Sequence, residues 1–504
     1  MPDSARRTLV ALAWMAGVSA VLLAVFPVGF PNYDTIYALL WGRELAHGIS
    51  PDYAAALPPT PHPLADLLGI LTTPLGDGAI TVTMVIAYAS LGLIAYLVYR
   101  LGSLWFDQAI GVLAALIVLT RAPYLSNGIR AYVDLPYIAL CLAALAIESR
   151  RRRAGWPVLA LLALAGLLRP EAWLFSAAYL AYLALDVERR AGAGQAPWRA
   201  ALRWRGRGEG PGLGWRGERP GAELAWLAAL AVSAPVAWGL FDLITAGSAT
   251  YSFTGTRDTV ETLERQTGPV DLVLYGPRRL GEVLQWPGMV GAAGGLVLTV
   301  ALMPRRAAIG AAAAALALGA FALLACAGLA IIPRYTMLAA AVLAVFASAG
   351  LLGWRLLERG ARWRGAWQGF AAVVALMFVV WGPNQYDLLK RVDTDLANQG
   401  QIEADLSDLA DSGAFDPLCL PISVPNHRAV PRLAFDLDVK PSQVVSSSEE
   451  RQPRRGYFLA PASPFVIHNF ILDPNDTRRL RSRVPPGFGP VARNRSWRLY
   501  RRCR

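Results

Sequence analysis

The chain has 504 residues, of which 55% are hydrophobic and 17% are charged, and its mean hydropathy is +0.38. Soluble globular proteins carry about 25% charged residues, so this composition argues against an ordinary soluble enzyme. It also excludes a mostly disordered chain, because disordered segments are poor in apolar residues. The apolar residues lie in blocks of about 20, the length that crosses a bilayer as a helix. We therefore expect a polytopic α-helical membrane protein.

The net charge of +12 comes almost wholly from arginine, since Lys390 and Lys440 are the only lysines. A basic chain can bind nucleic acid. Basic residues between apolar blocks, however, are those that set the orientation of a membrane protein. We therefore expect no nucleic-acid partner, and we interpret the arginine-rich segment 186–222 as a cytoplasmic loop on anionic lipid headgroups.

The first apolar run, from Leu9 to Val28, follows Arg6 and Arg7. It is longer than the apolar part of a signal peptide and no A-x-A cleavage site follows it, so we expect a retained transmembrane helix. Ten further apolar blocks bring the expected number of spans to eleven. They cover about 79–99, 109–123, 132–147, 156–168, 171–185, 223–244, 288–303, 307–332, 335–353 and 366–382.

Arginine placement indicates the topology. With the N-terminus in the cytoplasm, arginines are densest in the segments that this map places inside, as the positive-inside rule requires. Eleven spans then place the C-terminus outside. The expected location is a multi-pass position in the cell membrane, and the arginine- and alanine-rich composition is typical of a bacterial plasma-membrane protein.

A second domain is expected after Gly382, where no apolar run reaches membrane length. We predict a transmembrane domain over residues 1–382 and a small extracytoplasmic α/β domain over residues 383–504. In that second domain, residues 386–412 look helical. Short strands are expected at 430–439, 456–459, 466–472 and 496–500. The two cysteines outside the apolar blocks, Cys419 and Cys503, are expected to lie within disulfide range, because an extracytoplasmic domain can hold a disulfide.

The first outside loop opens with Asp34, which precedes a predicted helix over 35–46. Ile36, Leu39 and Leu40 fall on one helix face, so the helix is expected to lie on the membrane surface. Asp34 then stands at the N-cap, and capping alone would explain it. A carboxylate at the membrane–water interface is also well placed for catalysis.

Ionisable residues recur in the other predicted outside segments. Proline density holds His62 in a rigid turn, Pro61-His62-Pro63-Leu64. Arg130 precedes the next apolar block, and Asp134 begins its helix, where it could again be only a cap. Arg169 and Glu171 lie between two apolar blocks in Leu168-Arg169-Pro170-Glu171, an ordinary helix start that also holds an interfacial cation. Further candidates in later outside segments are Arg257, Asp258, Arg334 and Tyr335, although arginine and tyrosine at the interface are also common membrane anchors.

Together these residues resemble the glycosyltransferase-C superfamily, nearest to the branch of protein O-mannosyltransferases and lipid A aminoarabinose transferases. Members have an essential aspartate near the start of the first outside loop, followed by a surface helix, as at Asp34. Pro61-His62-Pro63-Leu64 is similar to a family motif that commonly has lysine where this chain has His62. Asp134-Leu135-Pro136, Leu168-Arg169-Pro170-Glu171 and Pro333-Arg334-Tyr335 also look like family strings. The resemblance covers essentially residues 1–382 and rests on the order and side of the motifs.

The resemblance implies a membrane glycosyltransferase that moves a hexose or pentose, such as a mannosyl or arabinosyl group, from a polyprenyl-phosphate donor. The acceptor would be an extracytoplasmic hydroxyl of a glycan, lipid or protein, and the anomeric centre would be inverted. Asp34 would be the base, because a carboxylate can accept the acceptor proton. Asp134 would bind the sugar or orient the acceptor. Arginines suit an anionic phosphate leaving group, so we expect Arg169, Arg257 and Arg334 to bind it. His62 is a further candidate for the same role.

Three alternatives stay open at this stage. No metal cluster stands out, but a divalent metal between Asp34 and Asp134 would match some branches of the superfamily. A transporter or flippase of lipid-linked saccharides would also need interfacial arginines, although such proteins often show inverted repeats, which the sequence lacks. A non-catalytic membrane scaffold whose tail binds cell-wall polymer would explain the tail but not the Asp34 loop.

Overall fold

The computed structural model describes residues 3–26, 29–184, 220–470 and 483–503. Each of the eleven apolar blocks is helical, as expected for segments whose backbone groups must be satisfied without water. These helices are α1 (Asp3–Val25), α4 (Gly78–Trp105), α5 (Gln108–Leu119), α7 (Asp134–Arg150), α8 (Trp156–Gly166), α9 (Glu171–Ala184), α11 (Pro220–Ala246), α13 (Gly268–Leu302), α14 (Pro304–Cys326), α15 (Met337–Leu352) and α16 (Arg364–Asp411). The predicted cytoplasmic loop at 186–222 lies outside the described residues, except for its last three.

The predicted membrane fold is confirmed, but the count of eleven spans is not. Among the described residues, six helices are long and apolar enough to cross a membrane. A seventh span results if α5 and α6 (Ala122–Ile129), which meet at 61°, are one broken span. The other predicted spans form shorter helices, such as α8 with 11 residues and α9 with 14.

Helix α15 lies at the centre of the membrane region and is buried along nearly its whole length. Small residues let its neighbours approach closely. A Cβ placed on Gly295 of α13 would lie only 2.0 Å from the carbonyl oxygen of Phe346 in α15. Glycine is therefore required at this crossing, where the backbones of α13 and α15 pack in direct contact.

The segment predicted as the outside loop 246–287 is mainly helical. It holds α12 (Tyr251–Thr262) and the first half of α13, which begins at Gly268. The helix kinks at Gln285, where φ is +62°, two residues before Pro287. Pro287 lacks a backbone N–H and so cannot complete the helical hydrogen-bond pattern. The part of α13 before the kink and the apolar block 288–303 are therefore not collinear.

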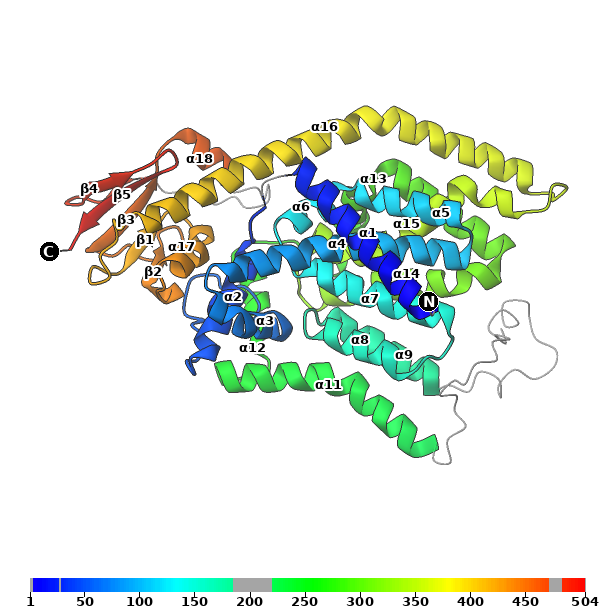
Figure 1. Cartoon of the computed structure of the whole chain (residues 1–504), viewed down its shortest axis with the longest axis horizontal. Helices are drawn as coiled ribbons and strands as arrows, with labels where there is room; N and C mark the ends of the chain where they lie inside the picture. Colours follow the sequence, from blue (N-terminus) through cyan, green and yellow to red (C-terminus); the bar gives the residue numbers. More distant parts are fainter. Residues whose placement is uncertain (1–2, 27–28, 185–219, 471–482, 504) are drawn as a thin grey trace.

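The tail carries a five-stranded sheet of order β2-β1-β3-β5-β4. Strand β1 (Ile422–Val424) pairs in parallel with β2 (Val444–Ser446) and β3 (Gly456–Pro461). Strand β5 (Trp497–Arg502) runs antiparallel between β3 and β4 (Gly489–Arg493). Figure 1 shows α16 running from the membrane region to this sheet at one end of the molecule. The expected domain boundary at residue 383 therefore falls inside one continuous helix.

Two of the four predicted tail strands are confirmed and two are wrong. The segments 456–459 and 496–500 fall in β3 and β5. The segment 430–439 instead begins with helix α17 (Val430–Asp436), and 466–472 overlaps helix α18 (Pro464–Asn469). Both helices have a proline in their first turn. Proline at this position favours the start of a helix, which explains why these segments are not strands.

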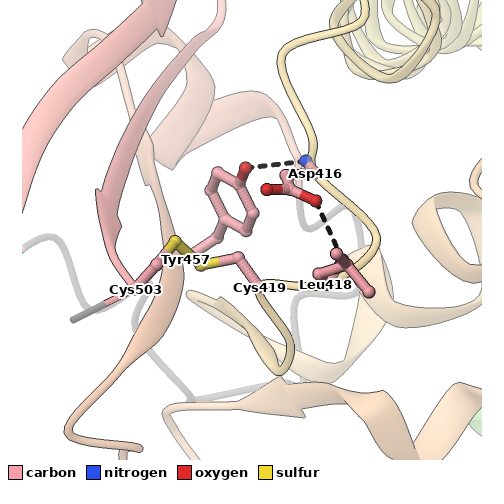
Figure 2. Close-up of a disulfide and its surroundings, with 5 residues drawn as sticks. All are labelled: Asp416, Leu418, Cys419, Tyr457 and Cys503. Atoms are coloured by element: carbon pink, nitrogen blue, oxygen red, sulfur yellow. Dashed lines mark hydrogen bonds between the residues drawn. A yellow bond between two sulfur atoms is a disulfide. The ribbon is translucent and has the colours of Figure 1, made fainter.

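The predicted pairing of Cys419 and Cys503 is confirmed. The two residues form a disulfide, with Cα atoms 5.5 Å apart. Figure 2 shows the bond beside Tyr457, whose hydroxyl accepts a hydrogen bond from the backbone N–H of Asp416. The disulfide joins the segment before β1 to the residue after β5, and so closes the sheet region of the tail.

Helix α2 (Tyr33–Ala46) does not lie on a membrane surface as predicted. Its residues from Thr35 to Gly42 are all buried. One side packs on α3 (Pro63–Thr72), where a Cβ on Gly42 would come within 2.5 Å of the Gly69 backbone. The other side shares a hydrophobic core with tail residues such as Leu433. The expected amphipathic pattern fails because α2 is enclosed by protein on both faces.

Candidate active site

The N-terminus of α2 is capped by Asn32, not by Asp34 as predicted. The Asn32 side-chain oxygen accepts hydrogen bonds from the backbone N–H groups of Asp34 (2.8 Å) and Thr35 (3.3 Å). The Asn32 amide donates to the carbonyl oxygen of Arg130 at 2.9 Å, and the Thr35 hydroxyl donates to that of Ala131 at 2.7 Å. These bonds fix the start of α2 on the segment before α7, and they leave the Asp34 carboxylate available for another partner.

That partner is Arg334, in the short helix η2 (Pro333–Thr336) before α15. Arg334 Nη1 donates to Asp34 Oδ2 at 3.0 Å. Burial opposes ionisation of Asp34, but the guanidinium of Arg334 outweighs it, and the pKa of Asp34 lies below its usual value. Asp34 is therefore an ionised carboxylate at neutral pH. Arg334 Nε is buried and has no hydrogen-bond partner, which leaves part of this guanidinium unused.

A second ion-pair group forms around Arg169, in the turn between α8 and α9. Arg169 Nη1 donates to Asp134 at the first position of α7. Its Nη2 and Nε donate to Glu171 Oε1 at 2.6 Å and 3.1 Å. Burial lowers the pKa of Arg169, but the negative charges of Glu171 and Asp134 raise it by more than burial lowers it. The pKa of Arg169 therefore lies above its usual value. Asp134 is thus an ion-pair partner, and its side chain makes no cap hydrogen bond.

The three residues carry two negative charges against one positive charge. All three are nearly buried: the exposed fractions are 1% for Asp134, 6% for Arg169 and 5% for Glu171. One oxygen of each carboxylate, Asp134 Oδ2 and Glu171 Oε2, is buried without a hydrogen-bond partner. Unpartnered buried carboxylate oxygens are costly, so they mark a place where a ligand with donor groups would bind.

Tyr335 joins the two groups into one cluster. The guanidinium carbon of Arg169 lies 4.3 Å from the centroid of the Tyr335 ring, and that of Arg334 lies 5.4 Å from it. Both distances are within cation–π range. Residues from four separate parts of the chain therefore converge, with α2 supplying Asp34, α7 supplying Asp134, the α8–α9 turn supplying Arg169 and η2 supplying Arg334.

His62 belongs to the same neighbourhood. It is the residue before α3, and its ring lies edge-on to Trp238 of α11, with centroids 5.8 Å apart. Burial lowers the pKa of His62 to about 4, against the opposing effect of Asp34, while Arg169 lowers it further. The imidazole is therefore neutral at physiological pH, and its buried Nδ1 has no hydrogen-bond partner.

Three predicted site residues are not members of this cluster, although one of them lies beside it. Arg130 donates to the Ser126 hydroxyl at 2.9 Å and stacks on Tyr132, whose ring centroid is 5.0 Å away. Because Arg334 lies 5.8 Å from the same ring, Arg130 is a neighbour of the site. Arg257 and Asp258 are exposed on α12. Arg257 lies over the ring of Phe253, 5.8 Å from its centroid, and close to Gly328, and neither contact belongs to the cluster.

Sequence reasoning missed several residues of the site. Arg265, after α12, adds positive charge that lowers the pKa of Asp34. His427 of the tail packs edge-on against Tyr33, the neighbour of Asp34, with ring centroids 5.5 Å apart. Asp66 is fully buried, and neither of its carboxylate oxygens has a partner, so burial raises its pKa well above the usual value. Asp66 lies one helical turn after His62, which is the signal that could have identified it.

An apolar cavity of about 260 Å³ borders the cluster. Its lining includes Tyr132, whose ring centroid lies 5.8 Å from the guanidinium carbon of Arg334, whereas the charged cluster residues themselves are not part of the lining. Leu67 and Leu71 of α3 also line the cavity, and both are exposed. The apolar space therefore extends from Tyr132, beside the cluster, to the exposed side of α3.

Metal binding was an open alternative for Asp34 and Asp134. In the part of the chain that the structure describes, no group of three or more His, Cys, Asp or Glu side chains could hold a metal ion. Asp34 and Asp134 each face an arginine instead of a further carboxylate.

No protein-family model and no curated protein sequence matches the chain. The chain does match solved structures. The crystal structure of ArnT from Cupriavidus metallidurans bound to undecaprenyl phosphate matches with a TM-score of 0.53 and 13% identity, over 98% of this chain and 97% of that one. The apo form of the same protein matches with a TM-score of 0.50 and 13% identity, over 99% and 98% of the two chains. The chain therefore shares its membrane fold with ArnT.

Proposed function

We propose that the protein is a membrane glycosyltransferase. It moves a sugar from a polyprenyl-phosphate donor to a hydroxyl of an extracytoplasmic glycan, lipid or protein, with inversion and with Asp34 as the base. The observation that carries the proposal is the convergence of Asp34, Arg334, Asp134 and Arg169 beside an apolar cavity. The fold shared with an undecaprenyl-phosphate-bound protein supports the same class of donor.

The reaction needs a base, a site for the leaving group and a place for the sugar. The acceptor oxygen attacks the anomeric carbon on the face opposite the phosphate. The bond from that carbon to the phosphate oxygen breaks, and its electron pair leaves with the phosphate. The acceptor proton moves to the Asp34 carboxylate, which its lowered pKa keeps ionised in the free protein.

Arg334 is the residue best suited to the phosphate. Its Nε is unpartnered, and the rest of the guanidinium holds Asp34. A phosphate bound to Arg334 would draw positive charge away from Asp34 and would raise the pKa of that carboxylate, making it a better base once the donor has bound. In this proposal neutral His62, whose Nδ1 has no hydrogen-bond partner, bonds the same phosphate or the sugar.

The sequence indicated that Arg169 would bind the phosphate, but we propose that it positions two carboxylates. Its guanidinium already holds Asp134 and Glu171, so it positions these carboxylates instead of binding phosphate. The unpartnered oxygens of Asp134 and Glu171 can then accept hydrogen bonds from sugar or acceptor hydroxyls. Arg130 adds positive charge beside Tyr132, while Arg257 and Asp258 stay outside this arrangement.

The apolar cavity would take the first isoprene units of the donor, whose chain continues into the bilayer past Leu67 and Leu71. This requires the site to lie at the outer surface of the membrane. We propose the corresponding topology in a bacterial plasma membrane, with the N-terminus in the cytoplasm and the tail outside.

The test uses the purified full-length protein in nanodiscs with a panel of undecaprenyl-phosphate sugars that includes mannose and arabinose. Release of undecaprenyl phosphate and the anomeric configuration of the product are measured with envelope extracts as acceptors. Transfer with inversion that is lost in Asp34→Asn is the expected result. Movement of the intact donor across proteoliposome membranes without cleavage would overturn the proposal in favour of a flippase.

A further inference from the structure

We propose that the β4–β5 hairpin of the tail binds an anionic polysaccharide. The binding surface, which we call the arginine hairpin, consists of Arg493, Arg495, Arg498, Arg501 and Arg502. This surface is separate from the Asp34–Arg334 site, and the proposal does not depend on the transfer reaction.

The charged residues at the end of the chain are all positive. From residue 477 to residue 504 the sequence has ten arginines and no aspartate or glutamate. Within the described ranges of the chain, none of the five hairpin arginines forms an ion pair with a carboxylate. Four of them are exposed, and Arg498 is half-buried. The hairpin therefore presents positive charge that the carboxylates of the described residues do not pair with.

Strand register concentrates this charge. Arg493 of β4 and Arg498 of β5 are direct cross-strand partners. Like charges at opposed positions repel each other. Arg498 Nη2 donates to the Ala462 carbonyl oxygen at 3.1 Å, but Arg498 Nε is buried and has no partner. An anion bound between the two guanidinium groups would remove the repulsion and satisfy this nitrogen.

The spacing suits a polymer with repeated charges. Side chains on one face of a strand alternate, so Arg498, Tyr500 and Arg502 share a face of β5. Four residues of extended strand place Arg498 and Arg502 about 13 Å apart. One small anion cannot reach both. Tyr500 lies between them and is partly exposed, so its ring can pack on a sugar ring while the arginines hold carboxylates in the fork geometry that guanidinium favours.

The position of the hairpin favours a polymer over lipid headgroups. Strand β4 is the outermost strand of the sheet, and Figure 1 shows the sheet at the end of the molecule, beyond α2 and away from the bundle of apolar helices. The Cys419–Cys503 disulfide fixes the residue that follows Arg502. The arginines are thus held on a rigid strand pair, on the side of the membrane that we propose to be outside.

The experiment measures binding of polygalacturonate, a carboxylated polysaccharide, to the full-length protein in phosphatidylcholine nanodiscs, with neutral dextran as the comparison polymer. Wild-type protein should bind polygalacturonate but not dextran, and the affinity should fall as salt rises. Arg493→Gln with Arg498→Gln should weaken binding about ten-fold or more, because two charge-assisted contacts are lost. Lys390→Gln with Arg391→Gln removes the same charge from an exposed part of α16 and should change the affinity less than about two-fold.

Equal weakening in the two double variants, or wild-type binding of dextran as tight as that of polygalacturonate, would overturn the proposal. Loss of polymer binding in discs that contain phosphatidylglycerol would also overturn it, because lipid headgroups would then occupy the hairpin. Thiol titration and the melting temperature show whether each variant keeps its disulfide and fold. If Arg493→Gln with Arg498→Gln does not fold, Arg493→Gln with Arg502→Gln, which changes two exposed arginines on the same face, replaces it with the same expected loss.

Discussion

Asn32 accepts a hydrogen bond from the backbone N–H of Asp34 at 2.8 Å, and so performs the capping that position 34 was expected to provide. This relationship decides the chemistry of the first outside loop. A capping carboxylate would be committed to the helix N-terminus. Because Asn32 supplies the cap, the Asp34 carboxylate instead pairs with Arg334, 300 residues away in the chain.

Replacing Asp34 with asparagine should abolish sugar transfer while leaving the fold intact. The amide keeps the size of the side chain but cannot accept the acceptor proton, so the rate should fall by roughly 10²-fold or more. Asn32 still caps α2, so the melting temperature should change little. Asp258→Asn, at an exposed position of α12, is the matched control and should retain wild-type turnover. Near-normal transfer by Asp34→Asn would remove Asp34 from the role of base.

The pH–rate profile should depend on Arg334. In the wild type the pKa of Asp34 lies below its usual value, so the base stays ionised until the pH falls below the normal aspartate range. Arg334→Gln removes the main stabilising charge while burial remains, so the pKa of Asp34 should rise. The acid limb of log kcat/KM should therefore move to higher pH in Arg334→Gln. An unchanged acid limb would show that another group sets it.

His62 should contribute no inflection near pH 6.5. Burial places the pKa of His62 at about 4, so the ring stays neutral between pH 5 and pH 8. The chemical shift of the imidazole protons, followed by NMR in selectively labelled protein, should be flat over this range. A His62 signal that shifts with a midpoint near pH 6.5 would contradict this assignment.

Removing Arg169 should destabilise the protein more than removing Arg257. Arg169→Met leaves two buried carboxylates, Asp134 and Glu171, without their cation. Loss of one partner from a buried ion pair typically costs about 3–5 kcal/mol. Arg257→Met removes an exposed arginine and should have little effect. Thermal unfolding in the same detergent gives the comparison, and similar melting temperatures for the two variants would contradict the buried ion-pair assignment.

Topology has its own test. A reporter fused after Arg504 should be active only in an extracytoplasmic compartment, while one placed within 186–219 should be active only in the cytoplasm. A cytoplasmic signal from the C-terminal fusion would move the Asp34 cluster to the other side of the membrane, and the proposed acceptors with it.

The helical membrane class could be predicted from the sequence alone. Every predicted apolar block is a helix, because a run of apolar residues has one stable backbone form in lipid. The candidate list also contained most of the cluster, since ionisable residues beside apolar blocks are rare enough to stand out. The Cys419–Cys503 pairing was predictable for a similar reason, because only two cysteines lie outside the apolar blocks.

Which candidates lie together depends on how the chain folds in three dimensions. The tertiary structure set Asp34 against Arg334, assigned Arg169 to Asp134 and Glu171, and left Arg257 on the surface. It also enclosed α2 between α3 and the tail, where the sequence indicated a surface helix. The physical reason is the range of the forces involved. Helix formation and capping depend on neighbours a few residues away, whereas an ion pair or a buried helix face depends on segments that are hundreds of residues apart in the chain.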